Sequence, residues 1–203
     1  PMDPQRESPF LRLPGELRNQ IYNAALATRS PIIDPGAPSH HTSTPPLCLP
    51  LIRTCRAVYA EASLGPLFAL NRFHFTAVTH AHLFLSNLTP AHRAFIQDIE
   101  VDVRSVHAQP GEWATYLDSS LSGIGKLGSL RTDAPGLKVL RLNFSAWPTI
   151  GLSRAELGQL LRQMVTGVAG SGLERLVVMG ASRGETMARR DPWSPVHYVG
   201  ADD

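Results

Sequence analysis

The chain has 203 residues, 43% of them hydrophobic, which is enough for one domain, or one domain and a small module, to bury a core. Its 19 Lys and Arg residues against 17 Asp and Glu leave a net charge of +2, too small to indicate a nucleic-acid surface. The two cysteines fit no zinc spacing, and there is no membrane-length apolar run or leader. We therefore expect an intracellular protein, cytoplasmic or nuclear, with no cofactor, no metal and no membrane contact.

The first predicted element is an amphipathic helix that starts near Leu13. Leu13, Leu17, Ile21 and Ala25 recur at every fourth position, and polar residues fill the positions between them. Pro14 suits the first turn of a helix, where its missing N–H is not needed. The pattern predicts a surface helix with one apolar face.

Residues 28–50 form the next stretch, and they contain six prolines among Ser, Thr and His. Such a composition predicts a loop, either a binding arm or a mobile insertion, with Ile32 and Ile33 as its one anchoring point.

A second amphipathic helix is predicted at residues 51–62. Its apolar stripe consists of Leu51, Cys55, Val58, Tyr59 and Ala62. Two helices that are each apolar on one face must bury those faces against each other or against a partner.

Three runs of sequence carry a resemblance to a known family. They are Leu-Pro-x-Glu-Leu-Arg-x-x-Ile-Tyr at 13–22, Thr-Cys-Arg-x-x-Tyr-Ala-Glu-Ala at 54–62 and Leu-Phe-x-x-Asn-x-Phe-x-Phe at 67–75. In this order and spacing they resemble the large group of fungal F-box-like proteins. In true F-box domains Leu-Pro opens a helical module that docks on the Skp-type adaptor of a cullin ubiquitin ligase. The resemblance implies adaptor contacts at Leu13, Pro14, Leu17 and Ile21; the alternative is that the two helices pack only on the rest of the chain.

After residue 65 the pattern changes from helical to alternating. Residues 71–75 alternate as a strand, and residues 79–88 read as a short helix with Leu83, Phe84 and Leu88 on its apolar side.

The second half of the chain repeats one pattern three times. The pattern is an apolar residue, then apolar residues three and five positions later, and it starts at Ile96, Leu137 and Leu173. The intervals are 41 residues, from 96 to 137, and 36 residues, from 137 to 173. Helix-length segments at 113–127 and 153–169 separate the three copies. Strands separated by helices predict a parallel sheet, which we describe as leucine-rich-repeat-like (LRR-like), with helices on one face.

Alternation along these strands separates an apolar face from a polar face. Glu100 and Asp102 lie on the polar face of one strand, and Arg141 and Asn143 lie on that of its expected neighbour. These four residues are the candidate partner-binding site, because strands hold such groups rigidly. The alternative is that they form cross-strand pairs on an ordinary solvated face.

Two short motifs match catalytic or cofactor patterns by letter only. The G-x-G-x-x-G at 123–128 closes a predicted helix instead of opening one, so it predicts no dinucleotide site. The G-x-S-x-G at 180–184 would need Asp191 and His197 to complete a hydrolase triad with Ser182. We expect no later strand to present that acid and histidine, so the hydrolase stays a minor alternative and the protein is predicted not to be an enzyme.

The sequence therefore predicts a mixed α/β protein. An F-box-like helical module at 10–70, with its insertion at 28–50, leads into an LRR-like region at 71–182 and a tail at 183–203. The predicted function is a non-catalytic interaction protein that bridges a Skp-type adaptor to a target. A stand-alone protein-binding domain without adaptor binding is the alternative.

Overall fold

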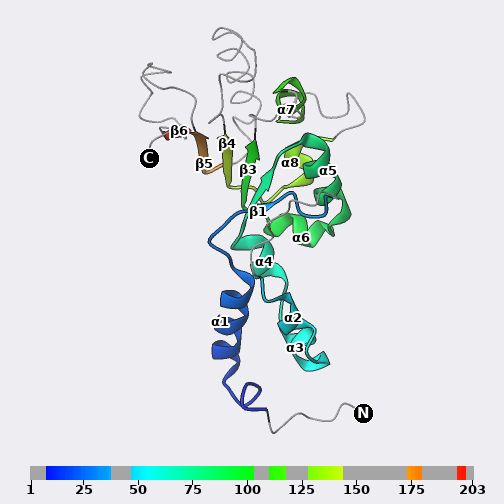
Figure 1. The fold of residues 1–203 in the computed structure, drawn as a ribbon, viewed down its shortest axis with the longest axis vertical. Helices are drawn as coiled ribbons and strands as arrows, with labels where there is room; N and C mark the ends of the chain where they lie inside the picture. Colours follow the sequence, from blue (N-terminus) through cyan, green and yellow to red (C-terminus); the bar gives the residue numbers. More distant parts are fainter. Residues whose placement is uncertain are drawn as a thin grey trace.

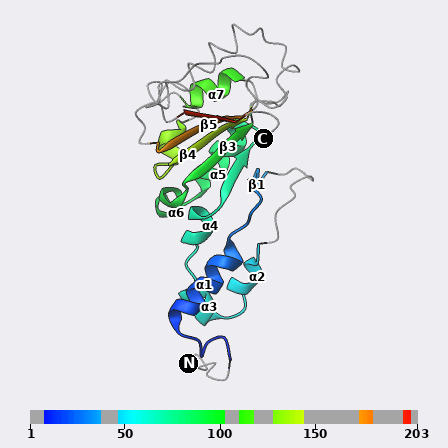
Figure 2. The ribbon, with the colours of Figure 1, turned by 90° about the vertical axis from the view of Figure 1, so that its left-hand side faces the viewer.

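The computed structural model describes residues 8–37, 47–102, 110–117, 128–143, 173–179 and 196–199. The molecule is elongated, with a group of helices at one end and a sheet flanked by helices at the other (Figures 1 and 2). The helices are α1 (Gly15–Leu26), α2 (Leu49–Ile52), α3 (Arg56–Glu61), α4 (Gly65–Ala69), α5 (Val78–Asn87), α6 (Pro90–Phe95), α7 (Pro110–Leu117) and α8 (Leu130–Asp133). The strands are β1 (Ile32–Ile33), β2 (Arg72–Phe75), β3 (Asp98–Asp102), β4 (Val139–Asn143), β5 (Arg175–Met179) and β6 (Val196–Val199).

Helix α1 packs on α2 and α3 through a face other than the predicted one. Tyr22 and Leu26 are the buried residues of α1, and they share a small core with Ile52, Val58 and Ala62. The predicted stripe is therefore not the face that packs on the other helices of the chain. Leu17 and Ile21 belong to that stripe, and they stay 44% and 39% exposed.

The predicted second helix is interrupted. Helix α2 ends at Ile52, and α3 begins at Arg56 after Cys55, whose Sγ accepts a hydrogen bond from the Val58 N–H at 3.5 Å. The break changes the helical phase, so Ile52 joins Val58 in the core and Tyr59 stays 68% exposed. The prediction that Tyr59 belongs to the buried stripe was wrong.

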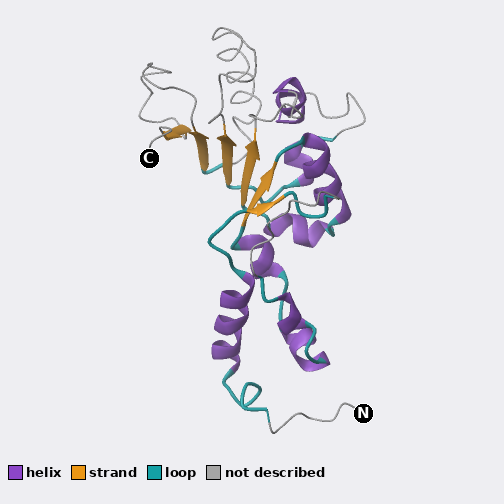
Figure 3. Ribbon diagram, viewed as in Figure 1, coloured by secondary structure: helices purple, strands orange, loops and turns teal. Residues whose placement is uncertain are grey.

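The strands of the described residues form a parallel six-stranded sheet in the order β1-β2-β3-β4-β5-β6 (Figure 3). Each strand therefore pairs with the strands before and after it in the chain. The repeat intervals of the sequence reappear as the pairing register, because Asp98 pairs with Val139, 41 residues later, and Val139 pairs with Arg175, 36 residues later.

Entry into the sheet also repeats from strand to strand. The backbone N–H groups of residues 138 and 139 donate to the Gln97 carbonyl, and those of 174 and 175 donate to the Lys138 carbonyl. The internal repeat in the sequence thus corresponds to a repeated backbone arrangement. The parallel pairing of these strands confirms the prediction of a parallel sheet.

One face of the sheet is apolar, and helices α5, α7 and α8 pack on this face. Its strand residues are Phe73, Phe75, Ile99, Val101, Leu140, Leu142, Leu176 and Val178. They share a core with Val78, Ala81 and Leu85 of α5 and with residues of α7 and α8. The expectation that Leu83 faces the core was wrong, because its side chain is 59% exposed. Of the predicted helical segment at 113–127, residues 113–117 belong to α7, and residues 118–127 lie outside the described residues, as does the predicted segment at 153–169.

Strand β1 lies inside the stretch that was predicted to be a loop. Ile32 is buried in the sheet core, and the next residue but one, Asp34, fastens the strand to β2. The Asp34 N–H donates to the His74 carbonyl at 2.9 Å, and its carboxylate accepts from the Thr76 N–H at 2.9 Å and from the Thr76 hydroxyl at 2.5 Å. The loop prediction was therefore wrong for residues 32 and 33, although their predicted anchoring role is confirmed and residues 28–31 and 34–37 are loop or turn. Residues 38–46 lie outside the described ranges.

Strand β6 is a second element that sequence reasoning missed. It pairs in parallel with β5, with His197 opposite Val177. The expectation that no strand follows residue 182 was wrong.

The chain passes three times between the two ends of the molecule. It runs from α1 to β1 in the sheet, then back to α2 and α3, and finally through α4 to β2 (Figure 1). Asn71 connects the segments that run between the two ends, and this residue is only 1% exposed. Its Nδ2 donates to the carbonyls of Leu26 at 2.6 Å and Leu67 at 2.8 Å, and its Oδ1 accepts from the Thr28 N–H at 2.7 Å. One side chain thus ties the end of α1 and the end of α4 to the start of β2.

Candidate functional site

The polar face of the sheet is built from alternate residues of β2, β3 and β4. The pairing places His74 opposite Glu100 and Glu100 opposite Arg141, and one step further along it places Asp102 opposite Asn143. The sequence prediction that Glu100 and Asp102 lie beside Arg141 and Asn143 therefore agrees with the register. Whether a partner binds there stays a prediction.

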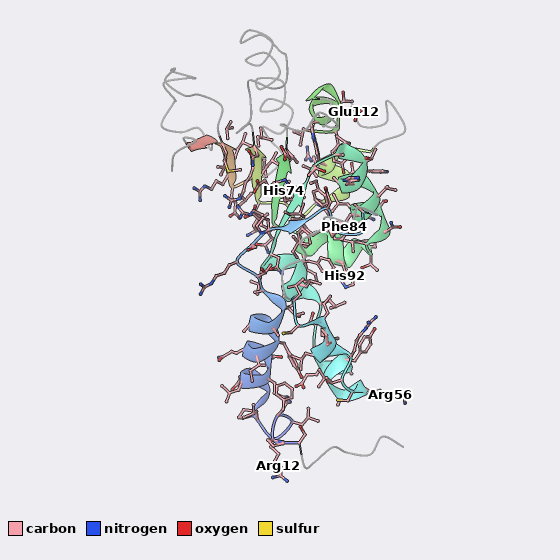
Figure 4. The ribbon with its side chains drawn as sticks, viewed as in Figure 1. Arg12, Arg56, His74, Phe84, His92 and Glu112 are labelled. Atoms are coloured by element: carbon pink, nitrogen blue, oxygen red, sulfur yellow. The ribbon has the colours of Figure 1, made fainter. Side chains whose placement is uncertain are left out.

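His74 stands between the two predicted carboxylates (Figure 4). Its Nδ1 lies 3.2 Å from Glu100 Oε1, and its Nε2 lies 3.6 Å from Asp102 Oδ2. Burial opposes the charged imidazolium, but the two carboxylates outweigh burial and raise the pKa of His74 to about 9. At neutral pH the centre of this face is therefore an imidazolium held by two acids.

Glu100 is held from two further sides. Asn143 Nδ2 donates to its Oε1 at 3.0 Å, and Arg72 lies 3.4 Å from its Oε2. Burial acts to raise the pKa of Glu100, but His74, Asn143 and Arg72 together hold it below its ordinary value. Glu100 and Asp102 are 5% exposed and Asn143 is 9% exposed. Three of the four predicted partner-binding residues thus form an internal network and offer little surface to a partner.

Arg141 has a different setting. Its guanidinium makes a bidentate pair with Asp98, with Nε and the second terminal nitrogen each 2.9 Å from a carboxylate oxygen. The hydrogen bonds that Arg141 donates to Asp98 raise the pKa of Arg141, and both side chains stay partly exposed. The arginine is therefore fixed in position at the rim of the polar face.

A cleft of about 430 Å³ opens beside Arg141. Its walls are the 28–30 segment that follows α1, the end of α4, and the first residues of β2, β3 and β4 with the residues just before them. These elements meet at the waist of the molecule in Figure 1. The cleft thus lies where the helical end joins the polar face of the sheet.

The outer surface of α1 carries the predicted adaptor contacts. Pro14 precedes the first turn, and its carbonyl accepts from the N–H groups of Leu17 at 3.0 Å and Arg18 at 3.1 Å. Leu13 is half-buried, whereas Pro14, Leu17 and Ile21 are exposed. Leu17 and Ile21 are four residues apart in α1, so they lie along one stripe of the helix, whereas Leu13 and Pro14 precede its first residue. The four predicted contacts therefore lie on the outer stripe of α1 and on the two residues just before the helix.

Arg18 fixes the position of that surface through hydrogen bonds on the inner side of α1. Its Nε donates to the two carboxylate oxygens of Glu61 at 3.0 and 2.9 Å, and its guanidinium also donates to the carbonyls of Leu11, at 3.1 Å, and Leu13. The Tyr22 hydroxyl donates to Glu61 at 3.2 Å. The hydrogen bond from Arg18 lowers the pKa of Glu61, which keeps this carboxylate charged. Arg18 thereby links the turn before α1, α1 itself and α3.

Sequence reasoning missed Arg72 and His74 as members of the polar face. The signal was present, because Arg72 and His74 alternate with Phe73 and Phe75 in a strand that was predicted. Aligning that strand beside β3 would have placed His74 between the two carboxylates.

The structure gives little information on the predicted hydrolase residues, on a metal site or on a membrane span. Ser182 and Asp191 of the hydrolase alternative lie outside the described residues, and for His197 only the backbone pairing in β6 is described. Among the described residues, no three His, Cys, Asp or Glu side chains are placed to hold a metal ion. Within the same ranges, no helix has the length and apolar character needed to cross a bilayer.

Comparison with known proteins adds no relative. No protein-family model, no curated protein and no solved structure matches the chain. The functional argument therefore rests on the two surfaces described above.

Proposed function

We propose that this chain is a non-catalytic interaction protein that bridges a Skp-type adaptor of a ubiquitin ligase to a target. The outer surface of α1 would bind the adaptor, and the LRR-like sheet region would bind the target. The proposal places the protein in the cytoplasm or the nucleus. The observation that carries it is the exposure of Leu17 and Ile21 on a helix that buries Tyr22 and Leu26 instead.

The two stripes of α1 support this division of roles. A helix that needs only to pack on its own chain has no use for a second apolar stripe, because exposed apolar side chains favour association. Leu17 and Ile21 form that second stripe, and the exposed Pro14 and the half-buried Leu13 directly precede the helix. Large apolar side chains grouped in this way are typical anchors of protein interfaces.

The rigidity of the surface also supports the proposal. Arg18 connects the Leu11 and Leu13 carbonyls to Glu61 of α3, so the segment that presents Leu13 and Pro14 is fixed before any partner arrives. A surface fixed in advance loses less conformational entropy on binding.

The sheet supports the second half of the proposal. Its consecutive parallel order, with helices packed on the apolar face, is the arrangement expected of an LRR-like array. The rim of its polar face carries the fixed Arg141 and the cleft, which are both suited to contact another molecule.

The test compares charged substitutions on the two stripes of α1. In Leu17→Asp and Ile21→Asp the new carboxylate stays in water, so we expect unfolding free energies within about 0.5 kcal/mol of the unmodified chain. Binding to a purified Skp-type adaptor, measured by titration calorimetry, should weaken at least about 30-fold in each variant, as for a lost interface anchor. Gln20→Asp adds the same charge at an exposed polar position and should change neither quantity.

Leu26→Asp is the contrasting variant. It buries an unpaired carboxylate in the core shared with Ile52 and should unfold the helical end of the molecule. If the unmodified, folded chain does not bind the adaptor, the bridging proposal fails and the stand-alone protein-binding domain remains. If Leu17→Asp destabilises the chain as strongly as Leu26→Asp, the assignment of the outer surface is wrong.

A further inference from the structure

We propose that the cleft at the base of the polar face is an anion-binding site, which takes a phosphate or carboxylate group attached to a small apolar group. The cleft is lined by four cationic side chains, Arg29, Arg72, Lys138 and Arg141, and by two acidic ones, Asp98 and Glu174. The lining therefore carries a net charge of +2. The positive charge comes from the 28–30 segment, β2 and the β4 side of the cleft, whereas the two acidic residues lie on β3 and just before β5.

The four cations are not equally committed to partners within the protein. Arg141 is fully engaged by Asp98 and acts as a fixed wall. Lys138 reaches Glu174 at 2.9 Å, but the two side chains are 46% and 63% exposed, and such surface pairs contribute little. Lys138 can therefore exchange Glu174 for a ligand at small cost.

Arg29 and Arg72 are more available to a ligand than Lys138 is. Arg29 is exposed and forms no ion pair or side-chain hydrogen bond with any described residue. Arg72 lies 3.4 Å from Glu100 Oε2, a long contact that a ligand can replace, while His74 and Asn143 keep the other carboxylate oxygen, Oε1. Guanidinium groups bind phosphate and carboxylate through paired N–H donors, so these two arginines suit an oxyanion.

The size and the apolar part of the cleft define the rest of the ligand. A volume of about 430 Å³ lies at the lower end of small-ligand sites, so it holds one charged group and a few neighbouring atoms. Leu70, which is 54% exposed, lines the cleft together with Ala69 and Val139. An apolar group next to the anion would cover this leucine.

The ligand can come from two sources, a phosphorylated or acidic segment of a polypeptide or a small-molecule anion. In the first case the segment would belong to the target of the proposed bridging function. The anion site itself does not depend on adaptor binding, so it is tested on the isolated chain without the adaptor.

The experiment titrates the full chain with phenyl phosphate, with the pentapeptide Ala-Leu-phosphoserine-Leu-Ala and with the same peptide lacking phosphate. We expect one or both phosphate probes to bind at low ionic strength and binding to weaken as salt is added. Arg29→Gln and Lys138→Gln should each weaken binding about tenfold, the loss of one charge-assisted hydrogen bond, and should leave the melting temperature unchanged. Arg131→Gln, an exposed arginine on α8 on the helical side of the sheet, is the matched control and should bind as the unmodified chain does.

The outcomes separate the two sources and the two proposals. Binding of the phosphopeptide supports a polypeptide ligand, and binding of phenyl phosphate alone supports a small-molecule anion at the same site. The inference is overturned if neither phosphate probe binds, or if Arg131→Gln weakens binding as much as Arg29→Gln does. Loss of adaptor binding in Leu17→Asp with phosphate binding intact would show that the two surfaces act independently.

Discussion

Replacing Asn71 by alanine should weaken the junction between the helical end and the sheet more than any other single polar change in the described residues. The substitution removes three hydrogen bonds and leaves their backbone partners in place. The Leu26 carbonyl is buried with this side chain, whereas the Leu67 carbonyl and the Thr28 N–H are partly accessible to water.

The expected cost follows from these three bonds. A buried polar group left without a partner costs about 1 to 3 kcal/mol, and water can replace part of the loss at the two accessible groups. We therefore expect Asn71→Ala to lower the free energy of unfolding by about 3 kcal/mol, which in a chain of this length lowers the melting temperature by about 10 °C. Asn71→Asp keeps an acceptor for the Thr28 N–H, but it turns negative charge toward two carbonyls and should cost at least as much.

Asn87 supplies a matched control for this substitution. Its Nδ2 also donates to the carbonyl four residues earlier, that of Leu83, at 2.8 Å, but the bond is exposed to solvent. Asn87→Ala should therefore change the free energy of unfolding by no more than about 0.5 kcal/mol. Urea denaturation measures these free energies of unfolding. Because Asn71→Asp keeps the acceptor for the Thr28 N–H, hydrogen exchange at the Thr28 amide should stay slow in Asn71→Asp but not in Asn71→Ala. A cost at Asn71 no larger than that at Asn87 would refute the reasoning.

Three further predictions concern the sheet. The pKa of His74 is raised to about 9 in the folded chain, so this side chain contributes about 3 kcal/mol to the free energy of unfolding. The contribution is fully present below the unfolded pKa of about 6.5 and is lost as the pH rises through about 9. Urea titrations from pH 6 to 9.5 should show this loss of stability, and His74→Gln should flatten the slope. Gly136→Ala would place its Cβ 1.9 Å from the Ala94 carbonyl oxygen. Thermal unfolding should therefore show a free energy of unfolding lower by about 1 to 3 kcal/mol or more. An unchanged melting temperature would contradict this close approach. Leu140→Ala should cost about 2 to 5 kcal/mol by denaturant titration, and a loss under 1 kcal/mol would contradict its core position.

The sequence predicted the sheet well because the sheet is a repeat. Three similar runs, at 96, 137 and 173, enter the sheet at equivalent backbone positions, so their spacing is the pairing register itself. Alternation then separated the apolar and polar faces of β3 and β4 correctly. Both signals are local in the sequence and need no knowledge of distant contacts.

The elements that were missed depend on such distant contacts. Strand β1 has two residues, too few for any periodic pattern, and exists because Asp34 binds Thr76 and the β2 backbone. On α1, periodicity found an apolar stripe but could not show which stripe faces inward. The inward face includes Arg18, whose guanidinium is satisfied by Glu61, 43 residues away. A charged residue on a packed face is not visible from hydrophobic spacing alone.

The repeated passage of the chain between its two ends has a consequence for dissecting the protein. Because β1 comes between α1 and α2, no single cut separates the helical end from the sheet. A fragment that starts at Asn71 would lack Ile32 and Ile33 and would leave the outer edge of β2 uncovered, and such an edge invites pairing with another molecule. A fragment limited to the helices would carry β1 without the strand it pairs with. Binding studies on either surface therefore need the uninterrupted chain, with single substitutions in place of excised pieces.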